Sequence, residues 1–166
     1  MAQAHVVADA SALISLGWVD QLELLPALFG RVLVPPAVAA EATQRGSALP
    51  SWCHVHPLGR PIDARVTTAR LGPGETEVIS LGLEIEDAWL ILDDAAARAL
   101  ARDLQLHVLG TAAVLVEAKS AGLIPLVRPT LDALLARGFR LHRRVYDLIL
   151  KAAGESQPKA HGQPQA

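Results

Sequence analysis

The sequence predicts an α/β fold, a three-layer α/β/α sandwich in which helices cover both faces of a central, mostly parallel sheet. Short apolar runs alternate along the chain with segments of helical periodicity, and 51% of the 166 residues are hydrophobic. Repeated strand and helix alternation favours parallel strands, and this apolar content is enough for one buried core. We therefore expect one folded domain with C-terminal helices over residues 1–154, and a polar, disordered tail over 155–166.

In the first half of the chain, the expected strands are short apolar runs and the expected helices carry local start signals. In order, we expect a strand at 6–8, a helix capped by Ser11, further helix at 19–28, a strand at 32–34, a helix from Pro36, a minor strand at 52–55 within the loop 45–61, and a helix at 75–83. Proline suits the first turn of a helix because its missing N–H needs no partner there.

The second half continues the same alternation and closes with helices. We expect a strand at 89–92, a helix at 95–103, a strand at 107–109, a helix at 112–121, and final helices at 131–136 and 145–153. Parallel strands end at a common edge of the sheet, where the functional groups of such folds gather. Asp9, Asp93 and Thr111 each follow an expected strand, so we expect them at that edge.

The charge and the single cysteine limit the environment and the partners of the chain. A formal net charge of -2 produces no overall basic field, so any contact with nucleic acid must come from a local patch. Cys53 has no second cysteine to pair with, which favours a reducing compartment. No apolar run approaches the length of a membrane span, and the N-terminus lacks a secretion signal. We expect a soluble, cytoplasmic protein.

Acidic residues stand where apolar runs end or where helices begin: Asp9, Glu41, Glu75 and the pair Asp93-Asp94. Carboxylates gathered at one edge of a sheet would form a site for a divalent ion such as Mg2+, which prefers hard oxygen ligands and needs few of them from the protein. Such an ion can supply the activated water and the charge neutralisation that phosphodiester hydrolysis requires. The pattern therefore predicts a metal-dependent nuclease.

Each acid also has an ordinary structural explanation. Glu75 and Glu77 would complement the dipole of the helix that they begin, and Glu41 alone is typical of a solvated helix residue. Asp9 is harder to explain in this way, because an acid that ends a buried strand is costly unless it is paired or liganded. Neighbours in an extended segment face opposite ways, so only one of the two aspartates at 93–94 is expected to point into the site, and the choice stays open.

Four segments resemble the PIN-domain ribonucleases, a family that includes the VapC-type toxins of bacterial and archaeal toxin-antitoxin pairs. Each resembles the segment around one of the family's four acidic positions: VVADASALISL at 6–16, VPPAVAAE at 34–41, LGPGETEVISLGL at 71–83 and LILDD at 90–94. The subgroup with GE-x-E at the third position, a GT turn and a GLIP segment matches best, as at 110–111 and 122–125. The order and spacing of these short motifs make the resemblance specific.

The resemblance implies an endoribonuclease that depends on Mg2+ or Mn2+. It assigns the ion to Asp9, Glu41, Glu75 and either Asp93 or Asp94, with Ser11, Glu77 and Thr111 in supporting positions. Most relatives carry aspartate at the third position; here either glutamate of the GE-x-E motif can fill it, and we favour Glu75. The resemblance also implies an RNA substrate, a small antitoxin as partner, and a homodimer. The alternative is a catalytically silent PIN-like module that binds nucleic acid or protein.

A local basic cluster lies near the C-terminus, at Arg137, Arg140, Arg143, Arg144 and Lys151. It is a candidate for contact with RNA phosphates, although a solvated helix face is the better explanation of the pattern. His54 and His56 share a face of the minor strand, but two histidines without a third ligand are more typical of structural residues than of a metal site.

Overall fold

The structure is a computed structural model that describes residues 5–46 and 48–156. Its centre is a parallel sheet whose strands are β1 Val6–Ala8, β2 Val32–Val34, β3 Cys53–Val55, β4 Trp89–Ile91 and β5 His107–Leu109. Their order across the sheet is β3-β2-β1-β4-β5, and every pairing is parallel. Val6 of the central strand is in register with Val32 on one side and Trp89 on the other. The predicted parallel sheet is therefore confirmed.

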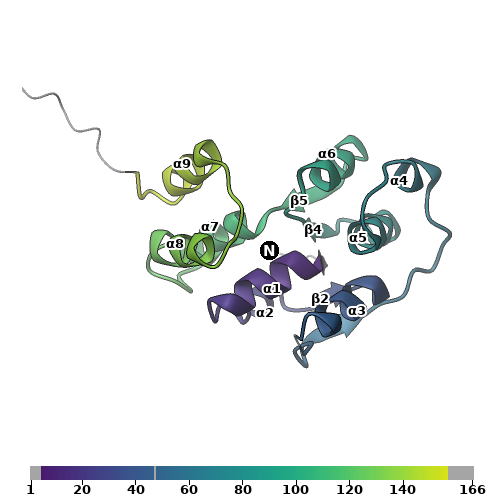
Figure 1. Cartoon of the computed structure of the whole chain (residues 1–166), viewed down its shortest axis with the longest axis horizontal. Helices are drawn as coiled ribbons and strands as arrows, with labels where there is room; N and C mark the ends of the chain where they lie inside the picture. Colours follow the sequence, from purple (N-terminus) through teal and green to yellow (C-terminus); the bar gives the residue numbers. More distant parts are fainter. Residues whose placement is uncertain (1–4, 47, 157–166) are drawn as a thin grey trace, which may run out of the picture.

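Two layers of helices enclose this sheet (Figure 1). The helices are α1 Ala10–Trp18, α2 Leu24–Phe29, α3 Pro36–Gln44, α4 Ala64–Thr67, α5 Pro73–Glu84, α6 Ala95–Asp103, α7 Thr111–Ser120, α8 Arg128–Ala136 and α9 Arg143–Ala152. On one side, α5 packs on β1 and β4, and α3, α4 and α6 surround it. On the other side lie α2, α7, α8 and α9, while α1 contacts both α3 and α7. None of the helices within the described residues could cross a membrane.

Local predictions differ from the structure at three places. The cap of α1 is Asp9, so the prediction of Ser11 as the cap is wrong and Ser11 lies inside the first turn. The helical spacing expected at 19–28 is interrupted, because the chain turns through Asp20 at φ 55° before α2 begins. The short helix α4 was not expected; the side chain of Asp63 caps it.

The central strand is buried on both faces, which explains why it carries only apolar residues. Val6, Val7 and Ala8 have no exposed surface, as expected for a parallel sheet that is covered on both sides. Helix α5 approaches β4 closely at Gly82, where an added Cβ would lie 2.7 Å from a methyl carbon of the fully buried Leu90. This close approach fixes the position of α5 over the sheet, and α5 carries one of the candidate acids.

The C-terminal end of the domain is held by Glu155, which the sequence had placed in the disordered tail. Its carboxylate accepts hydrogen bonds from Lys119 Nζ at 2.8 Å, from the N–H of Val127 at 2.7 Å and from the N–H of Arg128 at 2.9 Å. The prediction is therefore wrong for Glu155 itself, while residues 157–166 lie outside the described residues. Burial acts to raise the pKa of Glu155, but these donors outweigh it and hold the pKa below its usual value.

Replacing Gly82 by alanine should lower the free energy of unfolding by about 1–3 kcal/mol, because the new methyl group overpacks the contact with Leu90. Gly17 in α1 is the matched control, since a Cβ there would meet Leu22 at an ordinary 3.5 Å. Gly17→Ala should be neutral or raise stability by up to about 1 kcal/mol through better helix propensity. Urea unfolding of both variants measures the difference, and equal effects would contradict the close approach.

Replacing Glu155 by alanine should lower the free energy of unfolding at pH 7 by about 2 kcal/mol, because three donors lose their charged acceptor. The pKa of Glu155 is lowered in the folded state, so its contribution is present above the unfolded-state value of about 4.3 and is lost as the pH falls through the folded-state value. Chemical unfolding from pH 3 to 7, with the exposed Glu117→Ala as control, should show a deficit that shrinks only in the acid range.

Candidate metal centre

The carboxyl ends of β1 and β4 bring the predicted acids to one edge of the sheet. Asp9 directly follows β1 and caps α1. The pair Asp93-Asp94 follows β4, and Asp94 caps α6. Glu75 lies in the first turn of α5, and Glu41 lies on α3. Five acidic residues from four segments of the chain thus surround the end of the central strand, as the sequence predicted for the strand ends.

Asp9 is the most constrained of these acids, with only 4% of its surface exposed. Its Oδ2 accepts a hydrogen bond from Ser11 Oγ at 2.7 Å and a longer one from the Ser11 N–H at 3.4 Å. Its Oδ1 is the single buried side-chain polar atom without a hydrogen-bond partner in the described part of the chain. A buried charged oxygen without a partner costs free energy, so this atom is the strongest local indication of a ligand.

Gly74 creates the space into which that oxygen points. A Cβ at this position would lie 3.0 Å from Asp9 Oδ1 and 3.3 Å from Glu41 Oε2. The two carboxylates therefore face the same small volume beside the start of α5, and any side chain at Gly74 would fill it. Glu41 is not purely solvated, because its Oε1 also pairs with Arg45 at 3.0 Å across one turn of α3.

Glu75 is the acid most affected by its neighbours. Burial raises its pKa above the usual value, and repulsion raises the pKa further. The carboxylates that repel it are Asp9, Glu41 and Asp94. Glu77 connects two helices. Its Oε2 accepts a hydrogen bond from the Ala37 N–H at 2.8 Å and so joins α5 to the first turn of α3. Of the two glutamates, only Glu75 is coupled to the other acids in this way.

Asp93 and Asp94 face different partners, as expected for neighbours in an extended segment. Asp93 accepts from Thr111 twice: its Oδ1 from the N–H at 2.8 Å and its Oδ2 from the hydroxyl at 2.7 Å. Burial raises the pKa of Asp93, although Thr111 and Arg98 oppose that shift. Asp94 is exposed and uses only Oδ1, which accepts from the Ala97 N–H at 2.8 Å. Thr111, which is fully buried, thus links β4 to the start of α7.

Arg98 belongs to this edge, although the sequence gave no reason to select it. Its Nη1 donates to the backbone carbonyls of Asp93 and Leu92, the latter at 3.5 Å. It therefore places a positive charge beside the acids and fixes the backbone at the end of β4. The only signal in the sequence was its spacing, four residues after Asp94, on a helix whose other arginine, Arg102, is solvated.

The acids are gathered but are not in a closed coordination shell. Among the residues that the structure describes, no three histidine, cysteine, aspartate or glutamate side chains converge closely enough to hold a metal ion. Like charges repel, and most of these carboxylates already have a local partner. His54 lies on the edge strand β3, His56 follows the end of that strand, and both side chains are exposed. Residues 137–144 run from the end of α8 into the first turn of α9, and none of them forms an ion pair with these acids among the described residues.

Comparison with known proteins identifies the family. A PIN-domain family model matches residues 5–155, which is nearly the whole chain, so the chain belongs to the PIN-domain family. PIN domains are generally nucleases and typically use divalent metal ions. No curated protein and no solved structure gives a significant match. The family assignment and the three-layer fold agree, and they were both expected from the sequence.

Replacing Thr111 by valine should destabilise the protein by about 1–3 kcal/mol at pH 7, because Asp93 Oδ2 would lose its donor in a buried setting. Thr111→Ser keeps the hydroxyl and is the matched control, with a smaller loss from the missing methyl group. Urea unfolding at pH 7 compares the two. Equal losses would show that the methyl group, and not the bond to Asp93, is what Thr111 contributes.

Proposed function

We propose that this PIN domain is a Mg2+- or Mn2+-dependent endoribonuclease that hydrolyses RNA phosphodiester bonds. The observation that carries the proposal is the buried, unpartnered Oδ1 of Asp9, which faces the carboxylate of Glu41 across the space left by Gly74. A cation at that place would remove the cost of the unpartnered oxygen. The nuclease character of the family supports the proposal, and RNA as the substrate rests on the resemblance to PIN-domain ribonucleases.

The donor set suits a hard divalent ion. Carboxylate oxygens are the ligands that Mg2+ prefers, and the ion keeps several waters, so a few acids are sufficient. Asp9, Glu41 and Glu75 would hold it. Asp94 is supported as a fourth ligand because its Oδ2 makes no hydrogen bond in the described structure, whereas both oxygens of Asp93 are occupied by Thr111. A bound ion of this kind supplies an activated water and neutralises charge on the phosphoryl group.

The residues around the acids would orient them for this role. Ser11 holds Oδ2 of Asp9, which leaves Oδ1 turned toward Gly74. Glu77 accepts a hydrogen bond from Ala37 in the first turn of α3 and so fixes the position of the helix that carries Glu41. Fixed ligand geometry of this kind is what second-layer contacts provide at metal sites.

The resemblance to toxins extends the proposal to a cytoplasmic toxin that forms a homodimer and is held inactive by a small antitoxin protein. The second candidate function is a PIN-like module that binds nucleic acid or protein without cutting. Two observations favour it: the absence of a closed ligand shell among the described acids, and the pairing of Glu41 with Arg45.

Adding Mn2+ should raise the thermal midpoint of the native chain, because a ligand that binds only the folded state stabilises it. At a hundredfold excess over the dissociation constant the gain is about 2.7 kcal/mol. Asp9→Asn should lose most of this shift, whereas Asp20→Asn should keep it, since Asp20 is exposed and lies beyond the end of α1 opposite to Asp9. Differential scanning fluorimetry with and without EDTA measures the shift.

Cleavage is the direct test. A panel of single-stranded and structured RNAs is incubated with Mg2+, Mn2+ or EDTA and with the native chain, Asp9→Asn or Asp20→Asn. We expect RNA cleavage to require the metal and to be retained by Asp20→Asn. Asp9→Asn should reduce the cleavage rate by about a hundredfold or more, which is a loss of at least about 2.7 kcal/mol in transition-state stabilisation. Equal cutting by both variants would reveal a contaminating nuclease. A folded native chain without cutting or a Mn2+ shift would favour the binding module.

A further inference from the structure

The strongest positive charge in the described chain lies in one short segment that the acidic site does not use. Residues 137–144, RGFRLHRR, contain four arginines and a histidine, and no acid occurs between Asp132 and Asp147. The net charge of the whole chain is -2, so this is a local concentration of charge and not a general property. We call residues 137–144 the basic segment.

Backbone hydrogen bonds fix the start of the basic segment, and its arginines are exposed to solvent. It leaves α8 through Gly138 at φ 98°, and backbone hydrogen bonds of 3.0 Å join the N–H of Gly138 to Leu135 and that of Phe139 to Leu134. Phe139 and Leu141 pack against the core, while the four arginines are exposed. A fixed backbone that points charge outward loses little conformational freedom when a partner binds.

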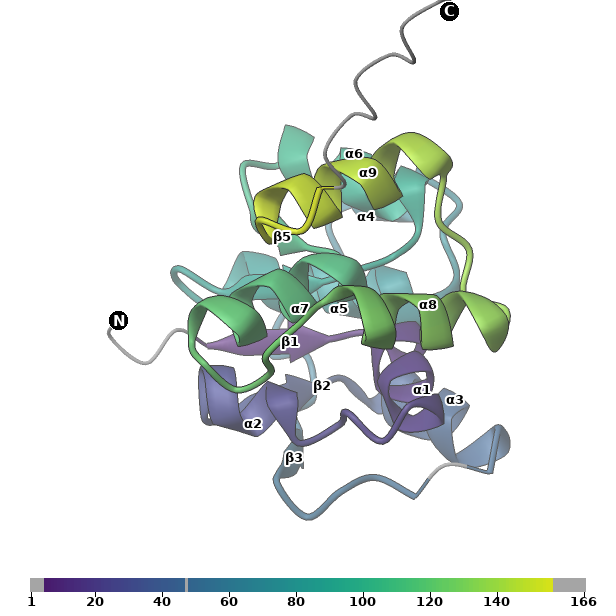
Figure 2. The same ribbon diagram turned by 90° about the vertical axis from the view of Figure 1, so that its left-hand side faces the viewer.

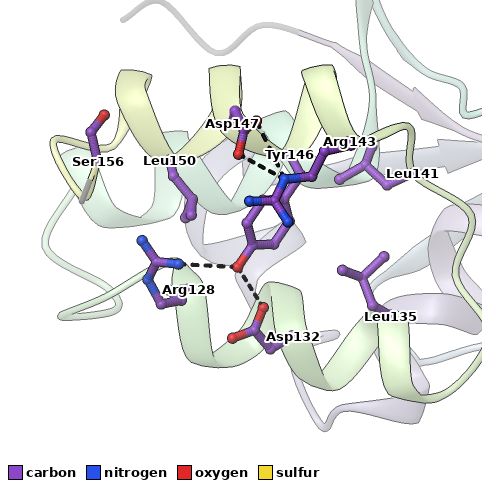
Figure 3. A pocket seen from close by; sticks show the side chains of 9 residues that line it. All are labelled: Arg128, Asp132, Leu135, Leu141, Arg143, Tyr146, Asp147, Leu150 and Ser156. Carbon is purple, nitrogen blue, oxygen red and sulfur yellow. Dashed lines mark hydrogen bonds and ion pairs between the residues drawn. The ribbon is translucent and has the colours of Figure 1, made fainter. Parts of the chain in front are cut away.

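The two helices that carry the basic segment are also joined to each other. Figure 3 shows Tyr146 of α9 reaching toward α8, where its hydroxyl donates to Asp132 at 2.7 Å and accepts from Arg128 at 3.2 Å. This contact spans a cavity of about 830 Å³ between the helices. Arg143 is engaged locally, because it pairs with Asp147 at 3.2 Å and lies 5.6 Å from the centre of the Tyr146 ring.

The remaining arginines of the basic segment have no such internal role. Arg137, Arg140 and Arg144 form no ion pair with any described residue. Arg144 lies in the first turn of α9, where the helix dipole disfavours a positive charge. These three side chains therefore carry charge that no ion pair with a described residue neutralises.

The position of the basic segment relates it to the acidic edge. In Figure 2, α8 ends and α9 begins on the side of the molecule toward which β1 runs, and Asp9 directly follows the end of β1. Helix α8 also packs on α1, which Asp9 caps. A polyanion that approaches the carboxylates is repelled by them, so its affinity must come from cations placed beside the site.

We propose that the basic segment binds the phosphate backbone of a nucleic-acid strand and holds it beside the acidic site, with Arg137, Arg140 and Arg144 as the contacting residues. The inference rests on the proposed nuclease function for its purpose, but the binding itself requires no catalysis. Phosphates are the shared chemistry of RNA and DNA, so the basic segment supplies affinity and position and does not select a base sequence.

The test measures binding without cleavage. Fluorescence anisotropy with a labelled 20-nucleotide single strand, as RNA and as DNA, is recorded in EDTA over a series of salt concentrations. The variant Arg137→Ala/Arg140→Ala/Arg144→Ala should bind both strands at least about tenfold more weakly at low salt. The slope of log affinity against log salt should fall by about 2, since each lost contact with a single strand contributes about 0.7.

A charge-matched control separates the basic segment from overall charge. Arg31→Ala/Arg60→Ala/Arg102→Ala removes three exposed arginines elsewhere and should leave affinity and slope within about twofold of the native values. Circular dichroism and the thermal midpoint confirm that both triple variants fold. Loss of binding in the control, or native binding in the first variant, would overturn the proposal. So would a loss confined to RNA, because the 2′-hydroxyl would then be what the segment reads.

A second measurement distinguishes failure of this inference from failure of the proposed function. With Mn2+ and a cleavable RNA, the basic-segment variant should raise KM by about tenfold and leave kcat within about twofold, because uniform binding is lost and the reacting groups are intact. Strand binding that depends on the basic segment, without any cleavage, would refute the nuclease and keep the binding surface. Cleavage with an unchanged KM in this variant would keep the nuclease proposal and refute the binding role of the basic segment.

Discussion

The burial of Asp9 at the end of the central strand is the constraint on which the rest of this structure depends. β1 pairs with strands on both sides and is fully buried, so the residue that follows it enters the interior whatever its charge. Ser11 satisfies one oxygen of Asp9, and the fold leaves the other without a partner. A domain that keeps an unpartnered carboxylate oxygen in its core gives up stability there, which is the usual sign of a site kept for binding.

The neighbouring elements are arranged around this carboxylate so that its charge can be tolerated. Gly74 begins α5 without a side chain, which leaves open space in front of Asp9 Oδ1. The other acids are restrained individually: Thr111 holds Asp93, the start of α6 holds Asp94, and Arg45 pairs with Glu41. Burial raises the pKa of Glu75, and the repulsion that remains between the acids raises it further. Each restraint lowers the cost of bringing like charges together, and a bound cation would complete that neutralisation.

Charge is separated within the domain, although its net value is close to zero. The acids gather where β1 and β4 end, and the arginines of the basic segment lie between α8 and α9. Glu155 ties the end of α9 to the start of α8, and Tyr146 joins the same two helices across the cavity. Both contacts keep the positive surface in a fixed position relative to α1 and Asp9, since α8 packs on α1. The proposed contact with a nucleic-acid strand rests on this separation of positive from negative charge.

The sequence by itself determined the strands, most helix boundaries, the parallel α/β class and the position of the acids at strand ends, because apolar runs, prolines and glycines act over a few residues. Tertiary structure decided which partners those acids have. Glu77 bonds to a residue 40 positions away, Asp93 to one 18 away, and Glu155 to one 36 away. No local pattern encodes such distances, since they depend on how the sheet stacks its segments.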